Sequence, residues 1–417
     1  MDTTLNAERF YERLERIQTH WMSHKSGIWG GCDAMFIALG AGADEINYSK
    51  SSSFFLYLLG YEFADSLIVV TRNNFYFMAT AKKCGMLEKD LVGKHDTIKI
   101  NLLTRTKDEG MNREHFNELS NAVRKGGGKR IGSVFKAEYE GNFIPSWLSF
   151  LEQSQLEKFD ITPALGLYLS IKDETELDLC KRAAVLSNKV LKHGFVQKME
   201  DILDNETKIT HEDLAKKVEE IILNPSEIGI KVSADTVDAC YFPIIQSGGI
   251  YDVKPSALSD KNQLKPDIIL CSLGARYKGY CANISRTFMV DTPKKVEKTY
   301  GILNSLYDAC LEQMIVGNEL KNVLEGAKTF LKKRDPELLN HLPKTLGSAV
   351  GIEFRDGSML LNSINTNTFQ AGMVYNLTIS LHNIPLLEEE KKGYSEQIQK
   401  LSMFSLILAD VVTIQKE

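Results

Sequence analysis

The sequence predicts a two-domain protein, with an α/β lobe over residues 1–171 and an α+β lobe over residues 172–417. Three observations lead to this prediction. A chain of 417 residues with 43% hydrophobic and 25% charged residues has ordinary globular composition and is long enough for two or three cores. Strand-like and helix-like patterns alternate up to about residue 170, as they do in α/β folds. Beyond that point, long helical stretches precede a region in which strand patterns dominate.

The first lobe opens with a predicted amphipathic helix over residues 7–24. Its apolar residues Phe10, Leu14, Ile17 and Trp21 recur at helical spacing, which places them on one face. Short β-like runs separated by turns follow, and two of them form a predicted hairpin. The predicted strands are 33–39, 66–71, 75–80, 98–103 and 130–135, with a further helix at 112–124.

At the start of the second lobe, residues 171–176 lead into a long predicted helical stretch to about Asp204, with acidic residues in its first turn. Thr210 and Asp213 form a near-match to a capping box, which predicts a second helix that ends before Pro225. The rest of the pattern contains the strands 237–246, 267–273, 280–290, 350–354, 374–381 and 406–414, and a helical block at 296–333. This order is typical of an α+β fold with a largely antiparallel sheet.

Composition and charge exclude several classes of protein. The net charge of −5, from 55 acidic and 50 basic residues, argues against a dedicated nucleic-acid binder, so no direct sequence-specific binding to DNA or RNA is expected. No run approaches the roughly 18–20 apolar residues of a membrane span, and the charged N-terminal segment does not read as a secretory signal. Seven scattered cysteines without a CxxC pair are typical of buried thiols in a reducing compartment. We therefore expect a soluble, intracellular protein without membrane contact.

Four strings in the second lobe share their order and spacing with one known architecture. They are Lys278–Phe288 (KGYCANISRTF), Gly347–Phe354 (GSAVGIEF), Gly372–Ile379 (GMVYNLTI) and Ile407–Thr413 (ILADVVT). They resemble the motifs GYxxDxxRTF, GHGIGLEF, GMVFTIEP and RIEDxVxVT of the pita-bread metallopeptidases, the methionine and Xaa-Pro aminopeptidases. The resemblance implies a pita-bread (creatinase/aminopeptidase-like) second lobe and a creatinase/prolidase-like first lobe.

The resemblance also implies where the metal ligands of those enzymes would lie. The enzymes hold two divalent metals with two Asp, one His and two Glu, and the metal pair activates a water for amide hydrolysis. Hard cations need anionic oxygens to offset their charge. The matching positions in this sequence carry Ser272, Asn283, Ser348, Thr378 and Ala409. No ligand of the family set remains, so we expect no metal, no cofactor and no catalytic residue, and hence an inactive aminopeptidase-like fold.

Neighbouring residues do not restore such a site. Asp267 lies an odd number of residues from the first of these positions and Asp410 is adjacent to the last, so on strands both point to the opposite face. A metal-free creatinase-like mechanism would need a histidine near residues 247–256. No histidine lies between His211 and His341.

Three further strings resemble a non-enzymatic group with this architecture. Phe54–Phe63, Phe75–Glu88 and Lys265–Gly274 are similar to the N-terminal domain of the large subunit of the FACT histone chaperone complex. This resemblance extends over essentially the whole chain. It implies a nuclear, chromatin-associated protein whose partners are core histones, their tails included, and the other FACT subunit, the latter through regions outside this chain.

Three functions remain open at this point. The leading hypothesis is a non-catalytic histone- or peptide-interaction module that contributes to nucleosome reorganisation in transcription, replication and repair. The second is a docking platform for non-histone replication or transcription factors, and the least favoured is an active metallo-aminopeptidase. The five vacated positions could contact a peptide in the cleft, or their polar side chains could satisfy one another in a plain scaffold.

Overall fold

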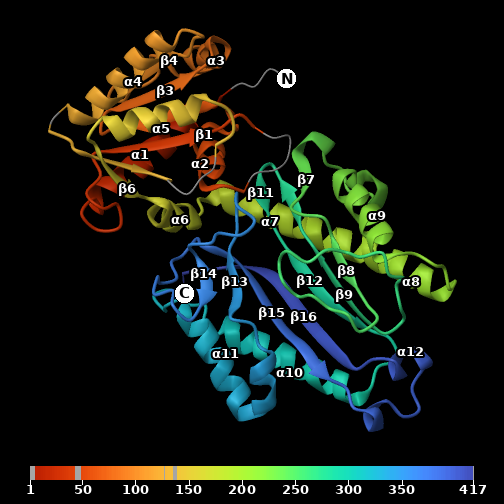
Figure 1. The fold of residues 1–417 in the computed structure, drawn as a ribbon. Coiled ribbons are helices and arrows are strands. Elements are labelled where there is room, and N and C mark those ends of the chain that lie inside the picture. Colours follow the sequence, from red (N-terminus) through yellow and green to blue (C-terminus); the bar gives the residue numbers. More distant parts are fainter. Residues whose placement is uncertain (1–4, 43–47, 126, 135–138, 417) are drawn as a thin grey trace. The chain divides into compact units, whose positions relative to one another are not determined.

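The computed structural model describes residues 5–42, 48–125, 127–134 and 139–416 (Figure 1). The chain forms two compact units, Met1–Leu169 and Ser170–Glu417. Within the described ranges, none of the helices combines the length and the apolar character that crossing a bilayer requires. All seven cysteines are buried thiols, and none of them forms a disulfide, as their scattered positions predict.

The first unit is built on a six-stranded sheet with the strand order β4-β3-β2-β1-β5-β6. β1, β2 and β3 pair antiparallel, whereas β4, β5 and β6 join the sheet in parallel, as the α/β prediction requires. The strands are β1 (Ala34–Leu39), β2 (Ser66–Val70), β3 (Asn74–Ala79), β4 (Lys99–Thr104), β5 (Arg130–Ser133) and β6 (Glu157–Asp160). The helices are α1 (Ala7–Ser23), α2 (Lys50–Leu59), α3 (Ala81–Leu91), α4 (Glu109–Arg124), α5 (Phe143–Gln153) and α6 (Thr162–Ser170).

The opening helix and the hairpin are confirmed, whereas several helices escaped prediction. The predicted apolar residues of α1 are all buried, and the Asn6 side chain caps its first turn. By contrast, α2 is buried on nearly all sides, so its sequence has no polar face to reveal a helical period. α4 begins after the Asp108 cap, earlier than predicted. The predicted strand 130–135 ends at Ser133 in the structure, and its last residue, Phe135, lies outside the described residues.

The second unit contains the remaining elements. Its helices are α7 (Glu174–Lys189), a π-helical segment (Val190–Val196), α8 (Gln197–Asp204), α9 (His211–Leu223), α10 (Lys294–Leu311), α11 (Lys321–Arg334) and α12 (Glu396–Gln399), with short 3₁₀ turns at Pro225–Ile228, Ala234–Thr236, Pro336–His341 and Glu388–Lys391. Its strands are β7 (Val237–Ala239), β8 (Ile244–Gln246), β9 (Ile268–Leu273), β10 (Ala275–Tyr277), β11 (Tyr280–Cys281), β12 (Ile284–Met289), β13 (Thr345–Ala349), β14 (Leu360–Asn362), β15 (Val374–Pro385) and β16 (Met403–Thr413).

Side-chain caps begin α7 and α9, where the sequence predicted helices. Asp173 and Glu176 form a reciprocal capping box at the start of α7, and the Thr210 side chain accepts the Asp213 N–H at the start of α9. The His211 ring then ties α9 to a distant loop, because Nδ1 lies 2.6 Å from Asp260 Oδ1 and Nε2 lies 2.8 Å from Ser247 Oγ.

The strands form a seven-stranded sheet with the order β14-β13-β15-β16-β12-β9-β8 and a three-stranded sheet with the order β11-β10-β7. Every pair of these strands is antiparallel, which confirms the predicted sheet type. Ile269, Cys271 and Leu273 of β9 belong to one core cluster with residues of α9. Since side chains alternate along a strand, Ser272 points to the other face of the sheet.

Three predicted segments are wrong in detail. The predicted strand 350–354 does not form, because β13 ends at Ala349 and the chain turns back, with Gly351 N–H bonded to the Glu353 carbonyl and Asp356 N–H bonded to that of Ala349. The predicted strand 237–246 splits into β7 and β8, which belong to different sheets and flank Pro243, a residue without an N–H. The predicted strand at 280–290 likewise divides into β11 and β12.

Candidate ligand cleft

A row of short side chains crosses the seven-stranded sheet on one face. The antiparallel register places Ser272 of β9 opposite Ser285 of β12, Ser285 opposite Ala409 of β16, and Ala409 opposite Thr378 of β15. Residues paired in this way present their side chains to the same face. Three of the five positions that the sequence singled out therefore lie in one row, with Ser285 between them.

The other two positions lie beside this row. Ser348 of β13 pairs with Asn376, which precedes Thr378 by two residues and so shares its face. Asn283 precedes Ser285 by two residues, and its Nδ2 donates a hydrogen bond of 3.3 Å to Asn376 Oδ1. The Tyr241 hydroxyl donates to Asn283 Oδ1 at 2.5 Å. The polar side chains at this end of the row thus partly satisfy one another.

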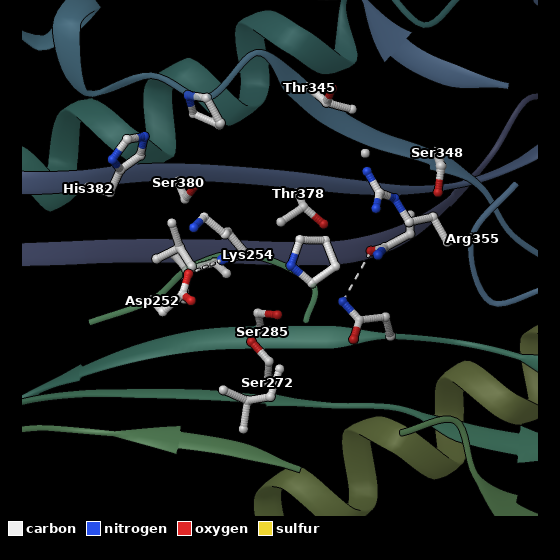
Figure 2. A pocket seen from close by; sticks show the side chains of 18 of the residues that line it. Asp252, Lys254, Ser272, Ser285, Thr345, Ser348, Arg355, Thr378, Ser380 and His382 are labelled. Atoms are coloured by element: carbon white, nitrogen blue, oxygen red, sulfur yellow. Dashed lines mark hydrogen bonds between the residues drawn. The ribbon is translucent and has the colours of Figure 1, made fainter. Parts of the chain in front are cut away.

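These residues form the floor of an open cleft of about 860 Å³ (Figure 2). Ser272, Asn283, Ser348 and Thr378 line the cleft, whereas Ala409, within the row, is fully buried and does not. The volume lies within the range of about 300–1,000 Å³ that small-ligand pockets span. The structure therefore brings four of the five sequence-predicted positions to one cavity.

The charged lining residues come from loops and not from the strands that form the floor of the cleft. Figure 2 shows Arg355 beside Ser348 at one end of the cleft, with Lys254 close to Asp252 farther along. Lys344 is the third cationic lining residue. Asp252 is the single carboxylate among the described lining residues, and its Oδ1 accepts the Lys254 N–H at 3.0 Å.

The other titratable lining residues are neutral near pH 7. Burial, together with the charge of His341, lowers the pKa of the His382 imidazole, so this ring is uncharged at neutral pH. Burial raises the pKa of the Tyr241 and Tyr251 hydroxyls well above their usual value. The lining of the cleft therefore carries three positive charges against one negative charge.

The metal pair that the fold family implies does not fit these residues. Among the described residues, no group of three or more His, Cys, Asp or Glu side chains is placed to hold a metal ion. The floor offers hydroxyls and amides, and the fifth position, Ala409, is a buried methyl group; none of these supplies the negative charge that two divalent ions require. Without a metal, the interactions that this cleft can make are hydrogen bonding, electrostatic attraction and apolar contact, the last through residues such as Ile244, Leu342 and Phe354.

The two nearby carboxylates are engaged elsewhere. The Asp410 carboxylate accepts a hydrogen bond of 2.8 Å from the Arg286 guanidinium. Asp267 is fully buried ahead of β9, and its Oδ1 accepts the Gly248 N–H at 3.1 Å. Neither residue lines the cleft.

Sequence reasoning missed several lining residues. Ser285, Asn376 and Ser380 lie two residues from predicted positions, so the strand period of two could have identified them. The cationic residues Lys254, Lys344 and Arg355 lie outside the strands, and no periodicity relates them to the floor.

Comparisons with known proteins agree with this architecture. Residues 5–164 match the model of the FACT complex subunit SPT16 N-terminal lobe domain, and residues 178–412 match that of metallopeptidase family M24. FACT complex subunit SPT16 of Oryza sativa subsp. japonica is 34% identical over 99% of this chain, and that of Arabidopsis thaliana is 32% identical over 99%. The chain spans 39% and 38% of the length of these two relatives.

Solved structures extend the comparison to the fold. The prolidase from Pyrococcus horikoshii OT3 covers 97% of this chain with a TM-score of 0.67 at 17% identity, which shows a shared fold alone. The N-terminal domain of FACT complex subunit SPT16 from Cicer arietinum (chickpea) has a TM-score of 0.88 and 31% identity, with 99% of this chain and 95% of that chain covered. Both family models match, and the agreement with the chickpea domain extends along nearly the whole chain. The chain therefore belongs to the family of FACT complex subunit SPT16 N-terminal domains, whose second unit has a pita-bread fold of the M24 type.

Proposed function

We propose that this chain is a non-catalytic interaction module of a histone chaperone of the FACT type, acting on chromatin in the nucleus. The observation that carries the proposal is the set of five positions that match metal ligands in the peptidases, all of which carry neutral side chains. Four of them line the cleft, and the fifth, Ala409, is buried in the same row. An M24-type cleft with this floor retains the space for a peptide but lacks the charge that holds the metal pair.

The proposal assigns the chain a part in nucleosome reorganisation during transcription, replication and repair. Its partners would be core histones, with or without their tails, and the other subunit of the complex would bind regions outside this chain. Support comes from the relatives, which are named as FACT complex subunit SPT16. This chain spans 38–41% of the length of these relatives.

Two measurements on the purified chain test the proposal. The first determines bound Zn, Mn and Co together with the hydrolysis of Xaa-Pro peptides in the presence of each metal. We expect neither stoichiometric metal nor metal-dependent hydrolysis. Near-stoichiometric metal accompanied by metal-dependent cleavage would show an active peptidase and overturn the non-catalytic assignment.

The second measurement titrates labelled core histones, intact and tailless, into the chain over a range of salt concentrations. Saturable binding that survives moderate salt supports the histone-binding module, because purely diffuse attraction between charges is screened over about 10 Å at 0.1 M salt. Loss of binding on tail removal would assign the contact to the tails. Absence of saturable binding to both histone forms at every salt concentration would contradict the histone assignment.

The second candidate is a docking platform for non-histone replication or transcription factors. The excess of positive charge around the cleft favours this candidate for the cleft itself, because histone tails are basic and like charges repel. Histone contact through another surface and docking in the cleft are compatible on one chain.

A further inference from the structure

We propose that the cleft of the second unit binds an acidic peptide segment. The inference rests on the proposed non-catalytic function and specifies the chemistry of the ligand. Its basis is the lining of the cleft, which combines a neutral floor capable of hydrogen bonding with an excess of cationic side chains.

The three cationic residues are free to bind an external anion. Lys254, Lys344 and Arg355 are exposed, and none of them forms an ion pair with any residue in the described parts of the chain. The guanidinium of Arg355 offers a planar fork of donors that matches a carboxylate. The ammonium groups of Lys254 and Lys344 line the same cleft and can receive further carboxylates of the same peptide.

The single lining carboxylate does not cancel this charge. Asp252 accepts the Lys254 N–H through Oδ1, so it is already held by the backbone of its own loop. His382, Tyr241 and Tyr251 are neutral near pH 7, because burial disfavours their charged forms. An incoming acidic peptide therefore meets a net positive charge from the side chains that face it.

The neutral floor determines the sign of the charge that the cleft attracts. With the ligand set of the peptidases, four carboxylates would stand at the floor and outnumber the cations when no metal is bound. Here the same positions carry hydroxyl, amide and methyl groups, so no floor residue opposes the cations. Ser272, Ser285 and Thr378 can instead hydrogen-bond to the peptide backbone or to its carboxylates.

A peptide fits these observations better than a nucleic acid does. Three cations at one cleft are few for a nucleic-acid binder, whose affinity depends on neutralising many phosphates. The chain as a whole carries a net charge of −5, which repels a polyanion at long range. A short acidic segment needs only the local charge of the cleft.

The test measures fluorescence anisotropy of labelled ten-residue peptides with the purified chain. Three peptides of equal length carry glutamate, glutamine or lysine at the same alternating positions. We expect saturable binding of the glutamate peptide, at least tenfold weaker binding of the glutamine peptide and no binding of the lysine peptide. Equal binding of the first two, or preference for the lysine peptide, would overturn the inference, as would tighter binding of a single-stranded oligonucleotide at the same salt concentration.

Variants locate the binding to the cleft. Arg355→Gln and Lys254→Gln are each expected to weaken binding of the glutamate peptide about threefold to fivefold, the range for one partly exposed charge pair. Asp252→Asn removes the opposing charge and is expected to tighten binding by a similar factor. Lys333→Gln, on the exposed end of α11 and outside the cleft, makes the same charge change and should leave affinity within twofold.

Three outcomes would separate this inference from the proposed function. If Lys333→Gln weakens binding as much as Arg355→Gln does, the attraction is diffuse and the inference fails. If core histones bind while the glutamate peptide does not, the inference fails and the histone-binding function stands. If the glutamate peptide binds in the cleft while histones do not bind at all, the histone assignment fails and the inference stands.

Discussion

Replacing the buried Asp267 with asparagine is expected to stabilise the second unit at neutral pH and to have less effect at acidic pH. The Asp267 side chain is fully buried, its Oδ1 accepts one hydrogen bond from Gly248 N–H, and its Oδ2 has no hydrogen-bond partner. Burial raises the pKa of this carboxyl from 3.8 to about 6, against the opposing effect of backbone N–H groups and of Lys265. The folded protein is therefore more stable with Asp267 protonated than with Asp267 as a carboxylate.

The size of the effect follows from the two pKa values. A shift from 3.8 to about 6 corresponds to about 3 kcal/mol, since each pH unit is worth about 1.4 kcal/mol. Below pH 3.8 the carboxyl is protonated in both the folded and the unfolded chain, and ionisation has no effect on stability. Between pH 3.8 and about 6 the folded state binds more protons, so the free energy of unfolding falls as the pH rises. Above about pH 6 the destabilisation of about 3 kcal/mol is complete. The Asp267→Asn variant has no carboxyl to ionise at this position and therefore does not lose this free energy.

Urea unfolding followed by far-UV circular dichroism between pH 4.5 and 8 measures this difference. Tryptophan fluorescence identifies the transition of the first unit, because Trp21, Trp29 and Trp147 all lie there. The gain in free energy of unfolding from Asp267→Asn should grow with pH and level off above about pH 6. The unpaired amide that asparagine introduces affects all pH values alike, so the dependence on pH is the diagnostic quantity.

Asp260→Asn is the matched control, with the opposite expected sign. Burial raises the pKa of the Asp260 carboxyl, but hydrogen bonds from His211 and Asn262 outweigh that effect and lower it overall. The folded state therefore favours this carboxylate, and its replacement should destabilise the protein at neutral pH and less so in acid. A gain for Asp267→Asn that is equal at pH 4.5 and pH 8, or larger at pH 4.5, would refute the assignment of a buried, disfavoured carboxylate.

Three further predictions concern packing, thiol reactivity and the cleft floor. Gly347→Ala should lower the free energy of unfolding by about 3 kcal/mol in urea titrations, because its φ of 126° is strained for alanine and a Cβ would lie 1.9 Å from the Asn376 carbonyl oxygen. Gly301→Ala is the control, since Gly301 lies on α10 with open space around it, and this change should raise the free energy of unfolding by about 0.5–1 kcal/mol. Equal effects of the two substitutions would contradict the reasoning. The seven buried cysteines should resist a thiol reagent in the native chain and all react after unfolding, because burial shields the thiols and raises the pKa of Cys32 to about 11. Rapid labelling of the native chain would count against their burial. Restoring the family ligands should lower the melting temperature of the metal-free protein at neutral pH, because four clustered carboxylates repel one another, and Mn²⁺ or Zn²⁺ should recover it. An unchanged melting temperature of the metal-free protein would disprove this repulsion. The restoring substitutions are Ser272→Asp, Asn283→Asp, Ser348→His, Thr378→Glu and Ala409→Glu.

Elements with a clear period and a local cap were predictable from sequence. The helix at Ala7–Ser23 shows its buried stripe directly, and α9 begins at the cap that Thr210 and Asp213 predict. Elements without an exposed polar face were not predictable, as α2 illustrates, in which every residue except Leu56 is buried. The wrong strand at 350–354 has a tertiary cause, because Cys281 N–H bonds to the Gly351 carbonyl and holds this apolar stretch in a turn outside the sheet.

The cleft shows the same division. Motif spacing identified Ser272, Asn283, Ser348 and Thr378, which the register of the sheet brings to one cavity. Ala409 shares their row, but its methyl group is too short to reach the cavity. The sequence contained no sign that Tyr241 would bond to Asn283, because the two lie in separate segments that meet only in the folded unit.

The sequence by itself determined the chemical identity of the floor. Metal coordination depends on the type of donor atom, and a set of Ser, Asn, Ser, Thr and Ala has no carboxylate or imidazole wherever the chain places it. Only the tertiary structure decided the charge of the cleft. Lys254, Lys344 and Arg355 come from separate loops, so their meeting at one cavity does not follow from sequence position. The strand period alone, by contrast, predicted that Asp267 and Asp410 point away from it. The physical reason is that Coulomb energy depends on distance in space and on burial, both of which are set by the packing of segments far apart in the chain.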